Sequence, residues 1–176
     1  GRDEAVEREE KMEGYGGDES AGGDKKTLLL PSNQRKLLED VLALGKPTAV
    51  VLLSGSALNA DDPRIGAIVQ AWYPGALGGQ AVGELLFGKY SPSGRLPVTF
   101  YRSIDDLPPF TDYAMKNRTY RYFEGEPLYP FGFGLSYTSF AYSELRAGTA
   151  DGVAVKVTVE NTGAVAGREV VQAYVR

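Results

Sequence analysis

The chain has 176 residues, a formal net charge of −4, and neither cysteine nor histidine. This composition excludes disulfides, thiolate nucleophiles, Cys/His zinc sites and histidine acid–base chemistry, so any proton transfer must fall to Asp, Glu, Lys or Tyr. The charge gives no electrostatic reason to expect a nucleic acid or a membrane as partner, no apolar run is long enough to cross a bilayer, and we expect no cofactor and no metal.

The first half of the chain opens with an irregular stretch and continues with a clear helix signal. Residues 1–26 are rich in charged residues and glycine, which is typical of a loop, a lid or a solvated tail. A helix is predicted over residues 33–45, because leucines and a valine recur there at helical spacing. Ser32 is expected to cap this helix, and Gly45 is expected to end it.

The next segments predict strands that alternate with helices. Residues 48–53 and 65–72 are continuous apolar runs, typical of parallel strands that are buried on both faces, and residues 80–88 predict a second helix. This alternation favours a layered α/β fold. Ser54-Gly55-Ser56 follows the first strand, at the end where open α/β sheets bind ligands; an ordinary turn is the alternative interpretation.

A proline-, glycine- and aromatic-rich segment extends from about residue 90 to residue 134. A short strand is predicted over residues 96–101, followed by irregular chain. We expect the aromatic rings to anchor this chain by packing, with a sugar-stacking platform as the alternative. The rings are those of Tyr113, Tyr120, Tyr122, Phe123, Tyr129, Phe131 and Phe133.

The C-terminal segment has the pattern of a β-sandwich. Valines alternate with other residues over 153–159, which predicts a half-buried strand, and residues 169–175 predict another strand. A sandwich of the immunoglobulin type needs roughly seven strands, and only two or three fit before the sequence ends. The sequence therefore predicts a sandwich of which only the first part is present.

Three phrases of the sequence together resemble glycoside hydrolase family 3. AWYPGALGGQAVGELLFGKYSPSGRLPVTFY and NRTYRYFEGEPLYPFGFGLSYTSFAY are similar to the later part of that family's second domain, and VTVENTGAVAGREVVQAYVR is similar to the start of its fibronectin-III-like domain. The resemblance implies a partial three-layer α/β sandwich of flavodoxin-like type over residues 1–135. It implies a truncated fibronectin-III-like β-sandwich over residues 136–176.

The resemblance also implies a mechanism with two carboxyl groups, of which this chain would hold one. The family's nucleophile is an aspartate on an N-terminal barrel domain, which nothing in this chain resembles. Its acid/base is a glutamate on a loop of the second domain. The stretch Glu7-Arg8-Glu9-Glu10-Lys11-Met12 is similar to that loop and implies Glu9 as the acid/base. Arg8 and Lys11 depart from the family pattern, so Glu7 and Glu10 remain alternates.

The function that the resemblance implies is part of a retaining, exo-acting β-glycosidase of the β-xylosidase or β-glucosidase type. The expected partners are an oligosaccharide or aryl β-glycoside substrate and a barrel domain in the same or another chain. The isolated chain is expected to be inactive. A secreted or periplasmic location is implied, although the sequence carries no targeting signal. The alternative is a non-catalytic fragment, or a carbohydrate-binding or interaction module.

Overall fold

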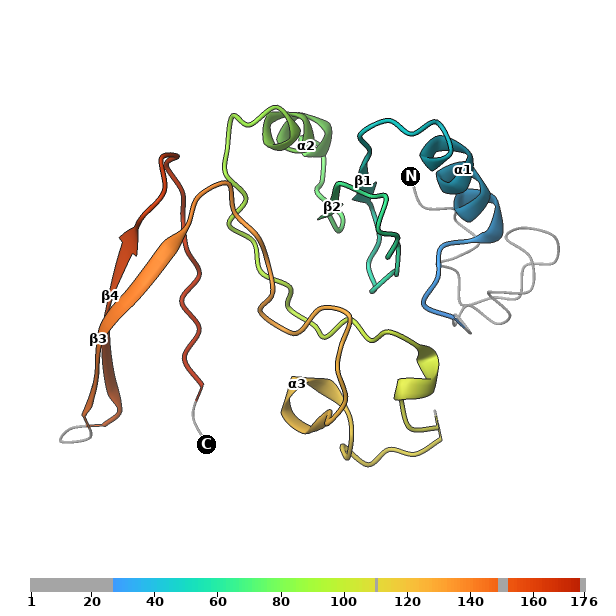
Figure 1. The fold of residues 1–176 in the computed structure, drawn as a ribbon. Coiled ribbons are helices and arrows are strands. Elements are labelled where there is room, and N and C mark those ends of the chain that lie inside the picture. The colour runs from blue at the N-terminus through green and yellow to red at the C-terminus, as the bar shows by residue number, and fades with distance from the viewer. Residues whose placement is uncertain (1–26, 110, 149–151, 175–176) are drawn as a thin grey trace. The chain divides into compact units, whose positions relative to one another are not determined.

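The computed structural model describes residues 27–109, 111–148 and 152–174, and these form two compact units. The first unit contains the described residues up to Gly78 together with those of Val98–Phe131. The second contains Gly79–Pro97 together with the described residues from Gly132 onwards. Each unit therefore combines segments that are distant in the sequence. Figure 1 labels the helices and strands of both units.

The first helix forms where the spacing of apolar residues predicts it. Helix α1 spans Ser32–Leu42. Pro31 holds the N-cap position and no side chain caps the helix, so the predicted cap by Ser32 is wrong: Ser32 is already the first helical residue. The helix ends at Leu42, three residues before the predicted end, and Gly45 follows with a φ of 64° and donates its N–H to the Leu42 carbonyl at 3.1 Å.

The two apolar runs form a parallel pair of strands, as predicted. Strand β1 spans Ala49–Leu52 and strand β2 spans Ala67–Gln70, with Leu52 opposite Gln70 in the register. One face of the pair packs on α1 and its neighbours. A single buried cluster lies on this face; it contains Leu30, Leu52, Leu58 and Ala60, with Leu38, Val50, Ile65 and Ile68 packed against it.

The predicted burial of both strand faces is wrong for the described part of the chain. Leu52 is the only fully buried residue of β1, and β2 has none. The physical reason is that the face with Val50 and Ile68 packs against the buried cluster, whereas Ala49 and Ala67 on the other face are exposed.

The second helix lies in the second unit, apart from its first residue. Helix α2 spans Gly78–Leu86, so it begins two residues before the predicted start and ends two residues before the predicted end. Gly88, with a φ of 73°, closes it as predicted. The sequence thus predicted the helix correctly and its bounds to within two residues.

The strand predicted over residues 96–101 is not formed. Phe100 makes one isolated antiparallel bridge with Tyr129, and Leu96 exchanges backbone hydrogen bonds with Phe133 and Gly132. Pro97 between these contacts has no N–H to donate, which prevents a continuous ladder. Two short helical turns follow, a 3-10 helix η3 over Ile104–Asp106 and the one-turn helix α3 over Thr119–Tyr122.

The C-terminal segment forms a long antiparallel hairpin (Figure 1). Strand β3 spans Phe140–Gly148 and strand β4 spans Ala154–Asn161, which confirms the strand predicted over 153–159. The predicted half-burial is wrong, because both faces of β4 are exposed except at Val157. Residues 169–174 form no strand, so the second predicted strand is also wrong; Glu169 instead contacts Arg95 and Tyr142 through its side chain.

No helix within the described residues is long and apolar enough to cross a membrane.

Candidate functional site

The three glutamates predicted as acid/base candidates, Glu7, Glu9 and Glu10, lie outside the described residues. The site is therefore built from the residues that follow them in the first unit. Two places there carry polar groups: the carboxyl ends of β1 and β2, and a pocket beside α1. In the described part of the chain, no three Asp or Glu side chains converge in a way that could hold a metal ion.

At the carboxyl ends of the strands, a buried serine ties β1 to β2. Ser54 is completely buried, and its hydroxyl donates to the Ser56 carbonyl at 2.8 Å. The Gln70 amide, at the end of β2, donates to the Ser54 hydroxyl at 3.1 Å and to its carbonyl at 3.2 Å. Since Ser54 is inaccessible and engaged, the structure favours the ordinary turn for this residue over a ligand contact.

The chain after β2 approaches the turn after β1 closely. A Cβ atom added at Gly55 would lie 2.8 Å from Cε2 of Tyr73, so only a residue without a side chain fits there without a shift. Trp72 has a φ of 52°, a left-handed backbone conformation that is rare for a bulky residue. Its ring meets that of Phe100 edge-on, with centroids 6.4 Å apart.

Backbone strain of this kind costs about 1–3 kcal/mol and is concentrated at functional positions. Trp72 is thus a candidate site residue that the sequence did not reveal. The only local signal was the turn at Tyr73-Pro74-Gly75.

A pocket of about 360 Å³ lies beside α1 in the first unit. Its apolar wall comes from the leucines of α1 and of the segment before it. Its polar wall comes from the residues that follow Leu58 and from Arg102. The residues used below are Leu29, Leu128, Asn59, Asp61, Asp62 and Arg102.

A buried asparagine fixes the polar wall of this pocket. Asn59 is 7% exposed, and its amide donates to the carbonyls of Tyr101 at 2.9 Å and Arg102 at 3.0 Å. Its backbone also bridges Leu29 in parallel. Because both links join segments far apart in the sequence, Asn59 holds the pocket's walls in a fixed relation.

One arginine neutralises two of the carboxylates at the pocket. Arg64 donates to Glu39 at 2.6 and 3.1 Å and to Asp62 at 2.7 and 2.9 Å. The hydrogen bond from Arg64 lowers the pKa of Asp62 to about 2 and also lowers the pKa of Glu39. Both carboxylates are therefore ionised and paired at neutral pH, and neither is poised to act as a general acid.

The sequence did not predict that these groups converge. Asn59, Asp61 and Asp62 stand in the stretch NADDP, whose composition signals only a turn. Arg102 follows 40 residues later.

The aromatic segment is held by ring packing, the role that the sequence favoured. Tyr101 and Phe123 meet edge-on with centroids 4.9 Å apart, and Tyr120 and Phe131 are stacked at 4.4 Å. Tyr129 packs edge-on against Phe100 at 6.2 Å. Tyr113 is 88% exposed, so among the seven rings it is the one most open to a sugar-stacking role.

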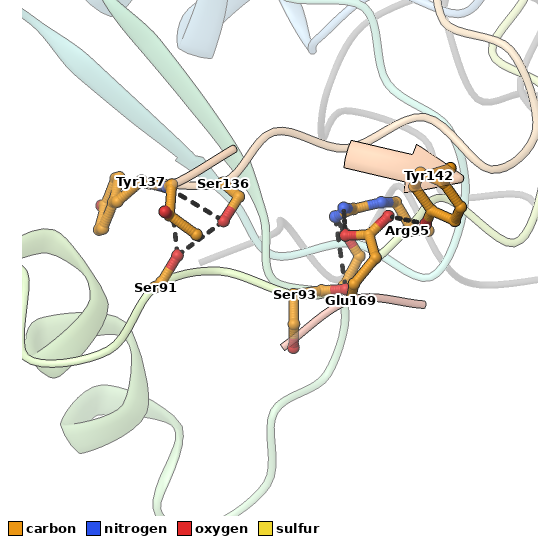
Figure 2. Close-up of polar contacts among 9 residues, drawn as sticks. Ser91, Ser93, Arg95, Ser136, Tyr137, Tyr142 and Glu169 are labelled. Atoms are coloured by element: carbon orange, nitrogen blue, oxygen red, sulfur yellow. Dashed lines mark hydrogen bonds and ion pairs between the residues drawn. The ribbon is translucent and has the colours of Figure 1, made fainter. Parts of the chain in front are cut away.

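In the second unit, a polar cluster joins three segments (Figure 2). Arg95 forms an ion pair with Glu169, both side chains being largely buried, and the Tyr142 hydroxyl donates to the other Glu169 oxygen at 2.8 Å. Ser91 and Ser136 hydroxyls lie 2.8 Å apart. The cluster offers no free acid or base, so its role is to hold β3 to the loop before Pro97 and to the segment around Glu169.

The sequence matches a known family of proteins over most of its length. The profile of the Glycosyl hydrolase family 3 C-terminal domain matches residues 2–137. The chain therefore belongs to glycoside hydrolase family 3, and the α/β fold of residues 27–137 is that of its C-terminal domain.

Particular members of the family are similar over most of the chain. A xylan 1,4-β-xylosidase of Xylanibacter ruminicola is 48% identical over 160 residues, covering 88% of this chain and 18% of the relative. A periplasmic β-glucosidase of Salmonella typhimurium is 38% identical, covering 85% and 22%. The solved structure of a β-glucosidase from Erythrobacter marinus is 38% identical with a TM-score of 0.68, covering 93% and 22%. The chain thus spans about a fifth of the length of these relatives.

Proposed function

We propose that this chain is part of a retaining, exo-acting β-glycosidase that hydrolyses O-glycosyl bonds at the non-reducing ends of β-linked oligosaccharides. The observation that carries the proposal is the family match over residues 2–137, together with relatives named β-xylosidase and β-glucosidase. The similarity is greatest, among those described above, to the xylan 1,4-β-xylosidase, which favours a β-xyloside as substrate.

In this proposal the chain supplies the acid/base and a barrel domain supplies the nucleophile. Retaining hydrolysis needs two carboxyl groups about 5–5.5 Å apart, one attacking the anomeric carbon and one protonating the leaving oxygen. Glu9 is the proposed acid/base, with Glu7 and Glu10 as alternates. A solvated glutamate is ionised at neutral pH, so Glu9 can donate a proton only when burial or a neighbouring carboxylate raises its pKa. Docking of the loop that contains Glu9 onto the barrel would bury the carboxyl group and so raise its pKa.

The remaining finer assignments, of domains and location, belong to the same proposal. We assign residues 1–135 to the family's α/β domain and residues 136–176 to the start of a fibronectin-III-like sandwich, in which β3 and β4 would be the first two strands. Exposed valines on β4, such as Val155, support a further sheet packing on the hairpin. A secreted or periplasmic location is supported by the periplasmic relative.

The test is a chimera in which this chain replaces the matching portion of the Xylanibacter ruminicola relative. We expect the chimera to hydrolyse aryl β-xylosides and the 176-residue chain alone to be inactive. Glu9→Gln should slow substrates with poor leaving groups far more than activated ones, and azide should restore turnover of the activated ones, because the covalent intermediate still forms.

Glu7→Gln and Glu10→Gln serve as matched controls with the same loss of charge. If one of them shows the leaving-group dependence and Glu9→Gln does not, the acid/base assignment moves to that residue. Hydrolysis by the isolated chain would refute the claim that the nucleophile lies on a barrel outside it.

A further inference from the structure

The pocket beside α1 has the size and the mixed lining of a small-molecule site. Its volume of about 360 Å³ lies at the lower end of the roughly 300–1,000 Å³ typical of such sites. Leu29 and Leu128 provide apolar surface, and Asn59 holds the opposite wall through its two hydrogen bonds to backbone carbonyls. The walls are therefore formed before any ligand enters, which reduces the ordering cost of binding.

Among the charged side chains that line this pocket, Asp61 is available to a ligand as an acceptor and Arg102 as a donor. Arg64 pairs with both Glu39 and Asp62, as described above, and Arg35 has a contact of its own. Within the described residues, the side chains of Asp61 and Arg102 make no ion pair and no hydrogen bond. These two groups have opposite signs and cancel, so the pocket does not select for a charged ligand.

Asp61 and Arg102 also act on the same phenol. Burial raises the pKa of Tyr129; the Asp61 carboxylate raises it further, and the Arg102 guanidinium lowers it. The carboxylate and the guanidinium, which both line the pocket, therefore also act electrostatically on one neighbouring ring.

We propose that this pocket binds one neutral pyranose sugar, whose hydroxyls donate to Asp61 and accept from Arg102, and whose C–H face packs on Leu29 and Leu128. A carboxylate accepts from vicinal hydroxyls and a guanidinium donates in a fork, so the pair can hold two neighbouring hydroxyl groups. A zwitterionic amino acid is the competing ligand class, since it could pair with both charges. The other charged groups that line the pocket, Glu39, Asp62 and Arg35, are already engaged, so none of them is left to fix the orientation of a zwitterion, and this favours the sugar.

The test is a titration of the ¹⁵N-labelled 176-residue chain, followed by the amide resonances of residues 59–62 and 101–102. D-Xylose and D-glucose are the probes, a choice that rests on the proposed function, and glycine represents the zwitterion. We expect saturable shifts with one of the sugars, at a dissociation constant on the order of 1–10 mM. Because binding and not hydrolysis is measured, failure here leaves the chimera experiment unaffected, and an inactive chimera leaves this result unaffected.

Two variants with matched controls locate the binding. Asp61→Ala and Arg102→Ala should each weaken sugar binding at least about tenfold, since each removes a charge-assisted hydrogen bond. Asp40→Ala, on the exposed surface of α1, and Arg121→Ala, in α3, should leave it unchanged. Asp61 is exposed, so the Asp61→Ala substitution does not disturb the core. If the amide resonances of that variant lose their dispersion, Asp61→Asn is used in its place.

Three outcomes would overturn the proposal. They are the absence of saturable shifts up to about 100 mM sugar, sugar binding that survives both Asp61→Ala and Arg102→Ala, and saturation by glycine in place of the sugars.

Discussion

Replacing Glu169 with glutamine should measurably destabilise the second unit, which contains the hairpin of β3 and β4. The Glu169 and Arg95 side chains are 14% and 11% exposed, so their ion pair is much closer to a buried pair than to a surface pair. Breaking a buried pair costs about 3–5 kcal/mol, whereas an exposed pair contributes about 0.2–1 kcal/mol. Glutamine keeps the shape and can still accept from Tyr142. Arg95 keeps its contacts to the carbonyls of Ser93 and Gly94 at 3.4 and 3.2 Å.

Because these contacts are retained, we expect the free energy of unfolding of this unit to fall by about 2 kcal/mol. This corresponds to roughly thirty-fold faster hydrogen exchange of the amides that become exposed when the unit opens. The assay is native-state hydrogen exchange at the paired residues Tyr142 and Val159. Glu160→Gln, the same charge change on the exposed surface of β4, is the control and should alter exchange by less than about 0.5 kcal/mol. If Glu169→Gln changes exchange no more than Glu160→Gln does, the Arg95–Glu169 pair does not hold the unit together.

Two further predictions concern the first unit. The pKa of Asp62, lowered from 3.8 to about 2, means that its contribution to stability is complete above pH 3.8 and is lost as the pH falls through 2. Arg64→Gln should return the Asp62 titration, followed by NMR, toward its ordinary range; an unchanged titration would refute the assigned cause. Gly55→Ala should destabilise the unit by no more than about 1 kcal/mol in thermal unfolding followed by circular dichroism, because the Tyr73 ring must move but is 59% exposed and can turn toward solvent. Gly83→Ala, in α2 with open space around it, is the control and should cost nothing.

The elements that the sequence predicted correctly are those whose signal is local. α1 follows from leucines at helical spacing, and the parallel pair of β1 and β2 follows from two continuous apolar runs. The β4 strand follows from alternating valines. In each case the pattern that specifies the element lies within the element itself.

The failures occurred where the structure depends on a partner elsewhere in the chain. Residues 96–101 have a strand-like composition, but Pro97 interrupts the ladder with the segment around Tyr129. Residues 169–174 have a strand pattern, yet Glu169 is held by side-chain contacts to Arg95 and Tyr142 instead of a neighbouring strand. Composition cannot reveal which partner a segment finds.

At the candidate site, too, the sequence did not reveal what depends on contacts between distant segments. The acid/base residues came from a resemblance and not from geometry, and Glu9 stays a prediction. The pocket could not be predicted from the sequence, because Asp61 and Arg102 come to line it together through the hydrogen bonds from Asn59 to the carbonyls of residues 101 and 102. A turn-like stretch and a lone arginine carry no sign of that bridge.

Trp72 is the single tryptophan of the chain, and it packs against Phe100 within the first unit. Intrinsic tryptophan fluorescence therefore reports on that unit alone and is blind to the hairpin. Circular dichroism, by contrast, sums over the helices and strands of both units. Unfolding curves recorded with these two probes would coincide only if both units lose their structure together. The position of Trp72 thus allows the cooperativity of unfolding between the two units to be measured without an added probe.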